Sequence, residues 1–245
     1  MRLFAIADLH LPGGDEKPMN VFGPHWERHF DKIRADWLAR VSDGDVVLIA
    51  GDISWAMQLR DAAPDLAAIG ALPGRKVLIK GNHDYWWSSL TQVRDILPDG
   101  MLALQHSAAD LGDFVVCGTR GWVFPTGGEP LPESDEKIYR RELARLELAL
   151  REAQALAGDR PIVAMTHYPP LFDAQRDTAF TALLERYHAA LAVYGHLHGN
   201  GIRAGFSGEH HGVRYALTSC DSLDFSLLEL PSLPFSDAEA PPSIT

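Results

Sequence analysis

The stretch VLIKGNHD at residues 77–84 passes from a short hydrophobic run into glycine, asparagine, histidine and aspartate. Short aliphatic and β-branched runs that alternate with helical patterns are typical of strands in a largely buried sheet. In such sheets ligands collect outside the carboxyl ends of the strands, so polar residues there are predicted to meet at one edge. Four other runs also end on side chains that can bind a metal: residues 3–7 before Asp8 and His10, 46–50 before Asp52, 162–166 before His167, and 191–194 before His196 and His198. The sequence therefore predicts a metal site.

Between these runs, hydrophobic residues recur at helical spacing, which predicts an α/β fold. The longest helix is expected to begin near Ser134, a favourable N-cap residue, and to end at Gly158. Shorter helices are expected around residues 30–41, 66–69, 90–97 and 180–187, and antiparallel strands between residues 203 and 230.

The chain is expected to form one domain over residues 1–230, followed by a tail over residues 231–245 that is rich in proline, serine and acidic residues. Such a tail is a surface strap or disordered. Two long connections, residues 11–29 and 119–133, are either lids and binding loops or covers for hydrophobic edges.

Composition restricts the partners. The 245 residues carry a formal net charge of −11, which argues against extended nucleic acid because its binders usually carry a basic stripe. Bound divalent cations would make the cleft the most positive place on the surface, so that it could still attract a phosphate. The two cysteines, Cys117 and Cys220, lie in strand-like runs, and two buried thiols fit a reducing compartment. With no signal peptide or membrane-length segment, a cytoplasmic protein is expected. The sequence indicates nothing about oligomeric state.

The ligand types indicate the metal. Asp8 and His10 suit one ion, Asp52 could bridge two, and Asn82, His167, His196 and His198 add an amide oxygen and imidazoles. Oxygen and imidazole ligands without thiolate favour Mn²⁺, Fe or Zn²⁺. A pair of such ions can clamp a phosphoryl group and activate water near neutral pH.

His83 adjoins Asn82 and is predicted to face the leaving group at the rim of the site. Asp84 could hold the His83 imidazole in a fixed orientation and raise its pKa. A protonated His83 would then assist the leaving oxygen.

These motifs, in this order, resemble those of the calcineurin-like metallophosphoesterase superfamily over residues 3 to about 200. The resemblance implies a four-layer αββα sandwich with two mixed sheets, helices on the outside, and a dinuclear site at the strand ends. It places Asp8, His10, Asp52 and His198 on one metal and Asp52, Asn82, His167 and His196 on the other. It also implies that His83 is catalytic. Of the metals that fit, Mn²⁺ is the one expected.

At several motif positions the chain differs from particular branches of the superfamily, and these differences disfavour the functions of those branches. Ile53-Ser54-Trp55 follows the second motif where protein phosphatases have a phosphate-gripping arginine, and Asp84 stands where they carry glutamate. The lipid-A pyrophosphatase branch has arginine in place of His83, the vesicle-sorting scaffold branch has lost catalytic side chains, and DNA-repair nucleases usually add a capping domain. The chain thus resembles the bacterial phosphodiesterase-type group.

The hypothesis that follows is cleavage of small phosphodiesters, such as nucleotide-type compounds, by in-line attack of a metal-bridged hydroxide. Three alternatives stay open: a phosphomonoesterase, a nuclease and a non-catalytic binding module. A monoesterase needs basic residues for the extra phosphate charge, and the sequence shows no obvious basic cluster near the motifs.

Candidate substrate contacts are less specific. Trp55, Trp86, Trp87 and Trp122 lie in or near the predicted site loops, where they could stack a nucleobase or fill the core. Arg120 and Arg176 could contact phosphate or lie on the surface. Among the other histidines, His25 and His29 lie beside the first motif.

Overall fold

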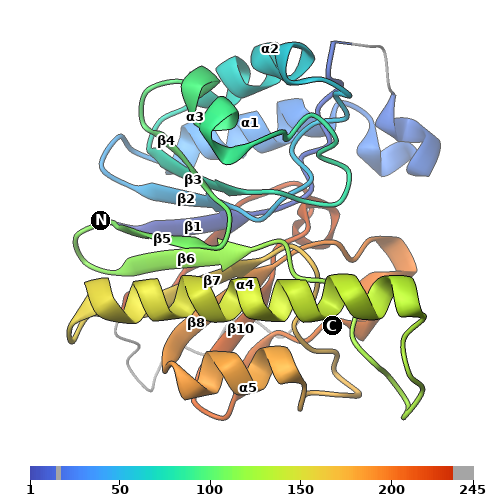
Figure 1. Cartoon of the computed structure of the whole chain (residues 1–245). Coiled ribbons are helices and arrows are strands. Elements are labelled where there is room, and N and C mark those ends of the chain that lie inside the picture. The colour runs from blue at the N-terminus through green and yellow to red at the C-terminus, as the bar shows by residue number, and fades with distance from the viewer. Residues whose placement is uncertain (15–17, 234–245) are drawn as a thin grey trace.

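The computed structural model describes residues 1–14 and 18–233, which form four layers (Figure 1). Two β-sheets face each other in the middle. Three α-helices cover the outer face of the first sheet, and two cover the outer face of the second, within the described part of the chain. The predicted α/β fold, an αββα sandwich with two mixed sheets, is confirmed.

The first sheet has the strand order β11-β1-β2-β3-β4. Four of its strands run parallel: β1 (Leu3–Ile6), β2 (Val46–Ile49), β3 (Arg75–Ile79) and β4 (Met101–Leu104). The edge strand β11 (Leu228–Leu230) is antiparallel to β1. Because parallel strands end at the same edge, the segments that follow β1, β2 and β3 lie close to one another.

The second sheet has the order β5-β6-β7-β8-β10-β9. Its parallel strands are β6 (Val115–Thr119), β7 (Ile162–Thr166), β8 (Ala189–Tyr194) and β10 (Val213–Leu217). The outer strands β5 (Ser107–Asp110) and β9 (Gly208–His210) are antiparallel to their neighbours. The carboxyl ends of β7 and β8 therefore also share one edge.

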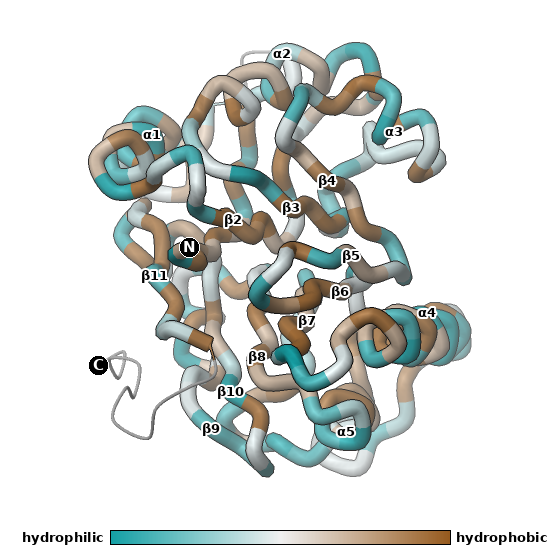
Figure 2. The backbone as a smooth tube through the Cα atoms, turned by 90° about the vertical axis from the view of Figure 1, so that its left-hand side faces the viewer, coloured by the Kyte–Doolittle hydropathy of each residue, from teal (hydrophilic) through white to brown (hydrophobic). Residues whose placement is uncertain are grey.

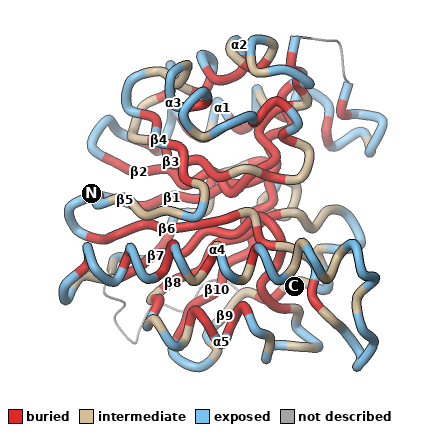
Figure 3. Tube along the Cα trace, in the orientation of Figure 1, coloured by how far each residue is buried: buried red, intermediate tan, exposed pale blue. Residues whose placement is uncertain are grey.

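Strand residues alternate between two hydrophobic cores. Ala5 and Leu48 pack between the sheets against residues such as Val163, whereas Phe4 and Val47 pack outwards against the helices. This alternation follows from the two-residue period of a strand, and burial on both faces explains why the runs are almost entirely apolar. Hydrophobic and buried residues accordingly run along the strands (Figures 2 and 3).

The helices agree with the predicted spacing. They are α1 (His29–Arg40), α2 (Leu59–Gly70), α3 (Leu90–Ile96), α4 (Glu133–Ala157) and α5 (Ala179–Arg186). Gly158 ends α4 with a φ of 58°, as predicted, but Pro132 occupies the N-cap and Ser134 lies inside the first turn. Acidic residues in that turn complement the positive end of the helix dipole instead.

The last third of the chain differs from the expected set of antiparallel strands. Only β9 and β10 form an antiparallel pair with each other, while β10 is parallel to β8 and β11 joins the other sheet. Cys220 begins a 3₁₀ turn (Cys220–Leu223) rather than lying in a strand. Further 3₁₀ turns are Met19–Phe22, Pro24–Trp26 and Gly199–Ala204.

Residues 234–245 of the predicted tail lie outside the described residues, as do residues 15–17 of the first long connection. Among the residues that the structure describes, no helix is both long and apolar enough to cross a membrane.

Candidate metal centre

The expected metal ligands lie at the carboxyl ends of five strands. Asp8 and His10 follow β1, Asp52 follows β2, Asn82 follows β3, His167 follows β7, and His196 and His198 follow β8. Asp8, His10, Asp52 and His196 have φ angles between 45° and 73°. Residues other than glycine rarely adopt such angles, and strain of this kind concentrates at functional sites. The chain therefore turns sharply after these strands.

Two glycines make the close approach of these segments possible. A Cβ atom on Gly195 would lie 2.6 Å from Oδ2 of Asp8. At Gly51, where φ is 94°, a Cβ atom would lie 2.7 Å from Nδ1 of His167. Any larger residue at either position would push the two sheets' ligands apart.

Asp52 lies between the candidate ligands that follow the strands of the first sheet and those that follow the strands of the second. Its Oδ2 atom is 3.9 Å from Nε2 of His10 and 3.4 Å from Nε2 of His167. Its Oδ1 atom accepts a hydrogen bond of 2.7 Å from the backbone N–H of His83. One carboxylate oxygen thus faces both halves of the site, which is the position that a bridging ligand needs.

Asp8 and His198 form the first half together with His10. Nε2 of His198 lies 3.4 Å from Oδ1 of Asp8. Two atoms that each bind one ion at about 2.1 Å are roughly 3.0–3.4 Å apart at octahedral or tetrahedral angles, so this spacing fits a shared ion. One oxygen or nitrogen atom from each of Asp8, His10 and His198 lies within 4.8 Å of the other two.

Asn82, His167 and His196 form the second half together with Asp52. Oδ1 of Asn82 lies 2.7 Å from Nε2 of His167 and 2.8 Å from Nδ1 of His196. The other nitrogen of His167, Nδ1, is 3.0 Å from the carbonyl oxygen of Ala50, to which it donates. That hydrogen bond fixes the tautomer and leaves the Nε2 lone pair for an ion.

Asp221 belongs to the site although the sequence did not point to it. Its Oδ1 atom lies 2.8 Å from Nδ1 of His198, and its Oδ2 atom accepts a hydrogen bond from the N–H of Gly199. Such a carboxylate orients a ligating imidazole and makes it more basic. Asp221 follows β10, whose carboxyl end lies beside that of β8. This strand carries no recognisable motif, so only the sheet order identifies the residue.

The electrostatics of the site favour cations. Burial lowers the pKa values of His167 and His198, but the nearby carboxylates outweigh it and raise them to about 9 and about 10. For His10 and His196, burial is the largest influence on the pKa and lowers it to about 4 in both. Oδ1 of Asp8 and Nε2 of His198 are buried without a hydrogen-bond partner among the described residues. The arrangement therefore fits two divalent cations, which would satisfy these atoms.

Asp84 has a different role from the one expected. Its Oδ1 atom accepts from the N–H groups of Ile53, Ser54 and the Trp86 indole, and its Oδ2 atom accepts from the N–H of Gly81. Nδ1 of His83 has no hydrogen-bond partner in the described chain. The interpretation that Asp84 orients His83 is therefore wrong. Asp84 instead ties the loops after β2 and β3 together, and burial raises its pKa to about 6.

The four tryptophans that were candidates for base stacking lie in three different environments. The Trp55 ring stacks on His10 with 4.8 Å between centroids and lies 4.5 Å from His83, so it adjoins the site. Trp86 and Trp87 are buried in the core, which rules out base stacking by either. Trp122 is half-buried, donates to Asp135 and packs on Tyr168, which in turn packs on His196.

The remaining candidates are dispersed. Arg176 forms an exposed ion pair with Asp173 and lies over Phe206. His25 is exposed, whereas His29 is buried and lies 2.8 Å from the carbonyl oxygen of Leu9. Neither histidine belongs to the groups that could hold a metal in the described chain.

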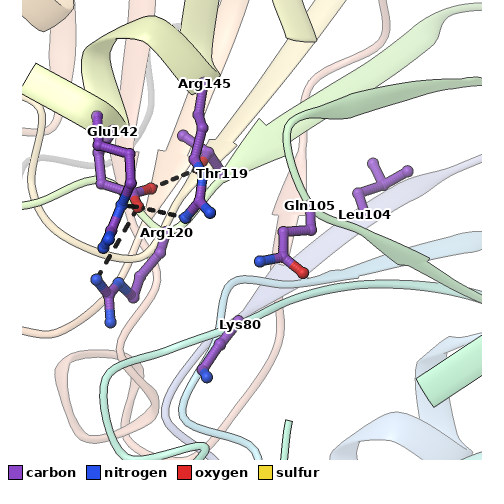
Figure 4. A pocket seen from close by; sticks show the side chains of 8 residues that line it. Lys80, Leu104, Gln105, Thr119, Arg120, Glu142 and Arg145 are labelled. Carbon is purple, nitrogen blue, oxygen red and sulfur yellow. Dashed lines mark hydrogen bonds and ion pairs between the residues drawn. The ribbon is translucent and has the colours of Figure 1, made fainter. Parts of the chain in front are cut away.

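Arg120 lines a pocket beside the metal edge that contains more basic residues than the sequence indicated. We call it the basic pocket, and its lining is Lys80, Leu104, Gln105, Thr119, Arg120, Arg141, Glu142 and Arg145 (Figure 4). The sequence shows no obvious basic cluster near the motifs because these cations come from three distant stretches that only the fold brings together.

Comparisons with known proteins agree with this architecture. The family model described as calcineurin-like phosphoesterase matches residues 1–200. The phosphopantetheinyl hydrolase of Mycobacterium tuberculosis has a similar structure, with a TM-score of 0.59 and 17% identity over 98% of each chain.

Two further structures share the fold. A protein from Thermus thermophilus has a TM-score of 0.54 and 17% identity, covering 94% of this chain and 88% of its own. A protein of unknown function from Aquifex aeolicus has a TM-score of 0.51 and 16% identity, covering 93% and 95%. No curated protein sequence matches the chain.

Proposed function

The chain belongs to the calcineurin-like phosphoesterase family, and we propose that within this family of metal-dependent phosphohydrolases it cleaves small phosphodiesters. The family binds a dinuclear divalent metal site, for which this chain has candidate ligand groups. The substrates that we propose are nucleotide-type diesters.

The observation that carries the proposal is the position of Asp52. Its Oδ2 atom faces both His10 and His167, so that one oxygen could serve two ions. Paired divalent ions stabilise the attacking and leaving oxygens of a phosphoryl transfer and supply activated water.

The residues of the site would bind the ions, orient the ligands and supply a proton to the leaving group. Asp8, His10, Asp52 and His198 would hold one ion, and Asp52, Asn82, His167 and His196 the other. Asp221 would keep His198 oriented through its Nδ1 atom. His83, whose Nδ1 atom has no protein partner in the described chain, would hold a proton for the leaving oxygen. Trp55 would restrict rotation of both His10 and His83 by packing against their rings.

Metal and compartment follow from the same side chains. Mn²⁺ is the ion we propose, with Fe and Zn²⁺ as alternatives, because the ligands are oxygen and imidazole without thiolate. Both cysteines are free and buried, which supports a reducing, cytoplasmic location.

The basic pocket favours a second candidate, a phosphomonoesterase, because a monoester brings one more negative charge than a diester. The hydrogen bonds and ion pairs of the proposed ligands, however, join them to one another, to Asp221 and to backbone groups, and the cations of the basic pocket take no part in them. Diester cleavage therefore remains our first choice.

The test compares an aryl phosphodiester with the matching monoester in the presence of Mn²⁺, Fe²⁺, Zn²⁺ or Mg²⁺. We expect a higher kcat/KM for the diester and the greatest activity with Mn²⁺. A higher value for the monoester would favour the second candidate. Absence of turnover with every ion, together with sub-stoichiometric metal by elemental analysis, would indicate a non-catalytic binding module instead.

A further inference from the structure

We propose that the basic pocket binds a second anionic group of the substrate, a phosphate other than the one that is cleaved. This inference rests on the proposed phosphodiesterase function and adds the substrate class: small phosphodiesters that carry an additional phosphate. None of the residues that line the pocket belongs to the proposed metal ligands.

The pocket concentrates positive charge in an acidic protein. Four cationic side chains and one carboxylate line it, whereas the whole chain has a formal net charge of −11. The side chains of Arg120 and Arg145 are 19% and 30% exposed, so water screens them only in part. An excess of partly desolvated cations attracts an anion more strongly than the same residues on an open surface would.

Glu142 positions the arginines without neutralising all of them. Its buried carboxylate accepts a hydrogen bond of 2.7 Å from Arg145, and it lies 3.6 Å from Arg141 and 4.0 Å from Arg120. Thr119 donates to its other oxygen. One negative charge is therefore shared among three guanidinium groups, and most of their N–H donors remain available.

Arg120 is held in place by stacking. Its guanidinium carbon lies 4.4 Å from the centre of the Trp122 ring, and the guanidinium has no hydrogen-bond acceptor among the described residues. A planar guanidinium with unused donors is suited to bind a phosphate through two parallel hydrogen bonds. Figure 4 shows Arg120 and Arg145 directed towards Glu142, with Lys80 and Gln105 across the cavity.

The pocket lies close to the metal edge. Lys80 precedes Asn82 by two residues, so their Cα atoms are at most about 7 Å apart. The carbonyl oxygen of Arg120 accepts hydrogen bonds of 2.9 Å from the N–H groups of both His167 and Tyr168. A ligand with one phosphate at the metals could therefore place a nearby second phosphate in the pocket.

The space suffices for such a group. The cavity has a volume of about 210 Å³, well above the roughly 15 Å³ that one water molecule requires. The side chains of Thr119 and Gln105 add neutral polar groups to the lining. A tetrahedral oxyanion thus fits both the size and the chemistry of the cavity.

The experiment compares the dinucleotide ApA with its 5′-phosphorylated form pApA, using the Mn²⁺-loaded full chain. The variants are Arg141→Gln and Arg145→Gln, and the control is Arg140→Gln. Arg140 neighbours Arg141 on α4 but is paired with Glu136 outside the pocket. Products are separated by chromatography, so that diester cleavage is distinguished from removal of the terminal phosphate.

We expect the wild type to cleave pApA with a kcat/KM about tenfold higher than that for ApA. A factor of this size corresponds to one added hydrogen bond to a charged group. Either pocket variant should remove this preference while ApA cleavage persists, and Arg140→Gln should retain it. Equal use of both ligands by the wild type, or a preference that survives in both variants, would overturn the inference and leave the proposed function intact.

Binding of both ligands is measured by calorimetry alongside turnover. If neither ligand is cleaved, the proposed function fails for this class of diester, but the affinity ratio still tests the pocket. A tenfold preference for binding pApA that Arg141→Gln or Arg145→Gln abolishes would support the second-phosphate site. Equal affinities would refute it.

Discussion

The metal edge and the basic pocket are neighbours, and both contain buried carboxylates, but they balance charge in opposite ways. Glu142 in the basic pocket is fully buried and has arginines and Thr119 as partners. Asp8 at the metal edge is also fully buried, yet its Oδ1 atom has no hydrogen-bond partner in the described chain. Nε2 of His198 lies 3.4 Å from this oxygen without donating a hydrogen bond to it, which leaves a position between the two atoms that a bound cation would fill.

This difference shows how the two regions would share one substrate. The metal edge has a deficit of positive charge that divalent cations would fill, whereas the basic pocket has an excess that a phosphate would fill. Substitutions in the two regions should therefore affect different properties. Those at the metal edge should change turnover and metal content, and those in the basic pocket should change stability and substrate preference.

The largest effect is expected at His83. Replacing His83 by Ala should lower kcat by about 10²–10⁴-fold, because a positioned proton donor is lost while the metal ligands remain. Activity on an aryl diester and metal content by elemental analysis provide the measurements. His188→Ala, at an exposed histidine directly before β8, serves as the control. Wild-type turnover in His83→Ala would show that the imidazole takes no part in the chemistry.

A smaller loss is expected at Asp221. The Asp221→Asn variant should bind the metal about 10–100-fold more weakly, because His198 loses the carboxylate that orients it. Calorimetric titration of the metal measures the change. Asp224→Asn, at an exposed aspartate three residues further on, should have no effect. An unchanged affinity in Asp221→Asn would mean that His198 does not depend on this contact.

In the basic pocket, Glu142→Gln should lower the free energy of unfolding by about 1–3 kcal/mol, because the arginines lose their shared counter-charge. The partial exposure of these arginines limits the cost. Chemical denaturation measures it, with Glu147→Gln on the same helix as a control whose contacts with Arg186 and Tyr187 are only partly buried. Loss of bound metal in Glu142→Gln would contradict the separation of the two regions.

The smallest effect concerns an ion pair that is exposed to water. The hydrogen bond from Arg160 lowers the pKa of Asp110 to about 2. A depressed pKa stabilises the fold above the ordinary value of about 3.8, and this contribution is lost as the pH falls towards 2. Arg160→Ala should raise the Asp110 pKa towards 3.8 in an NMR titration. An unchanged pKa would mean that the two side chains do not pair in solution.

The strand-end motifs could be predicted from the sequence because they are local. Each hydrophobic run and the polar residue after it lie within about ten residues, so the two-residue strand period and the motif spacing together place Asp8, Asp52 and His167. The same reasoning failed between residues 203 and 230. Short strands there have no sequence signal for the neighbour they pair with, and β11 crosses to the other sheet.

The role of Asp84 shows a second limit. A carboxylate beside a histidine in the sequence is a reasonable candidate to orient it, but neighbouring residues on a turn need not point the same way. The four N–H groups around Asp84 come from the loops after β2 and β3, and buried N–H groups require acceptors. The hydrogen bonds from these four N–H groups therefore determine the orientation of the Asp84 carboxylate.

The sequence by itself determined the α/β fold class and the set of strand-end side chains that converge at one edge, because both depend on patterns within single segments. Only the tertiary structure decided that Asp221 supports His198, that Trp86 belongs to the core, and that Lys80, Arg120, Arg141 and Arg145 surround one cavity. These relations depend on which strands become neighbours, and long-range packing free energy selects the neighbours.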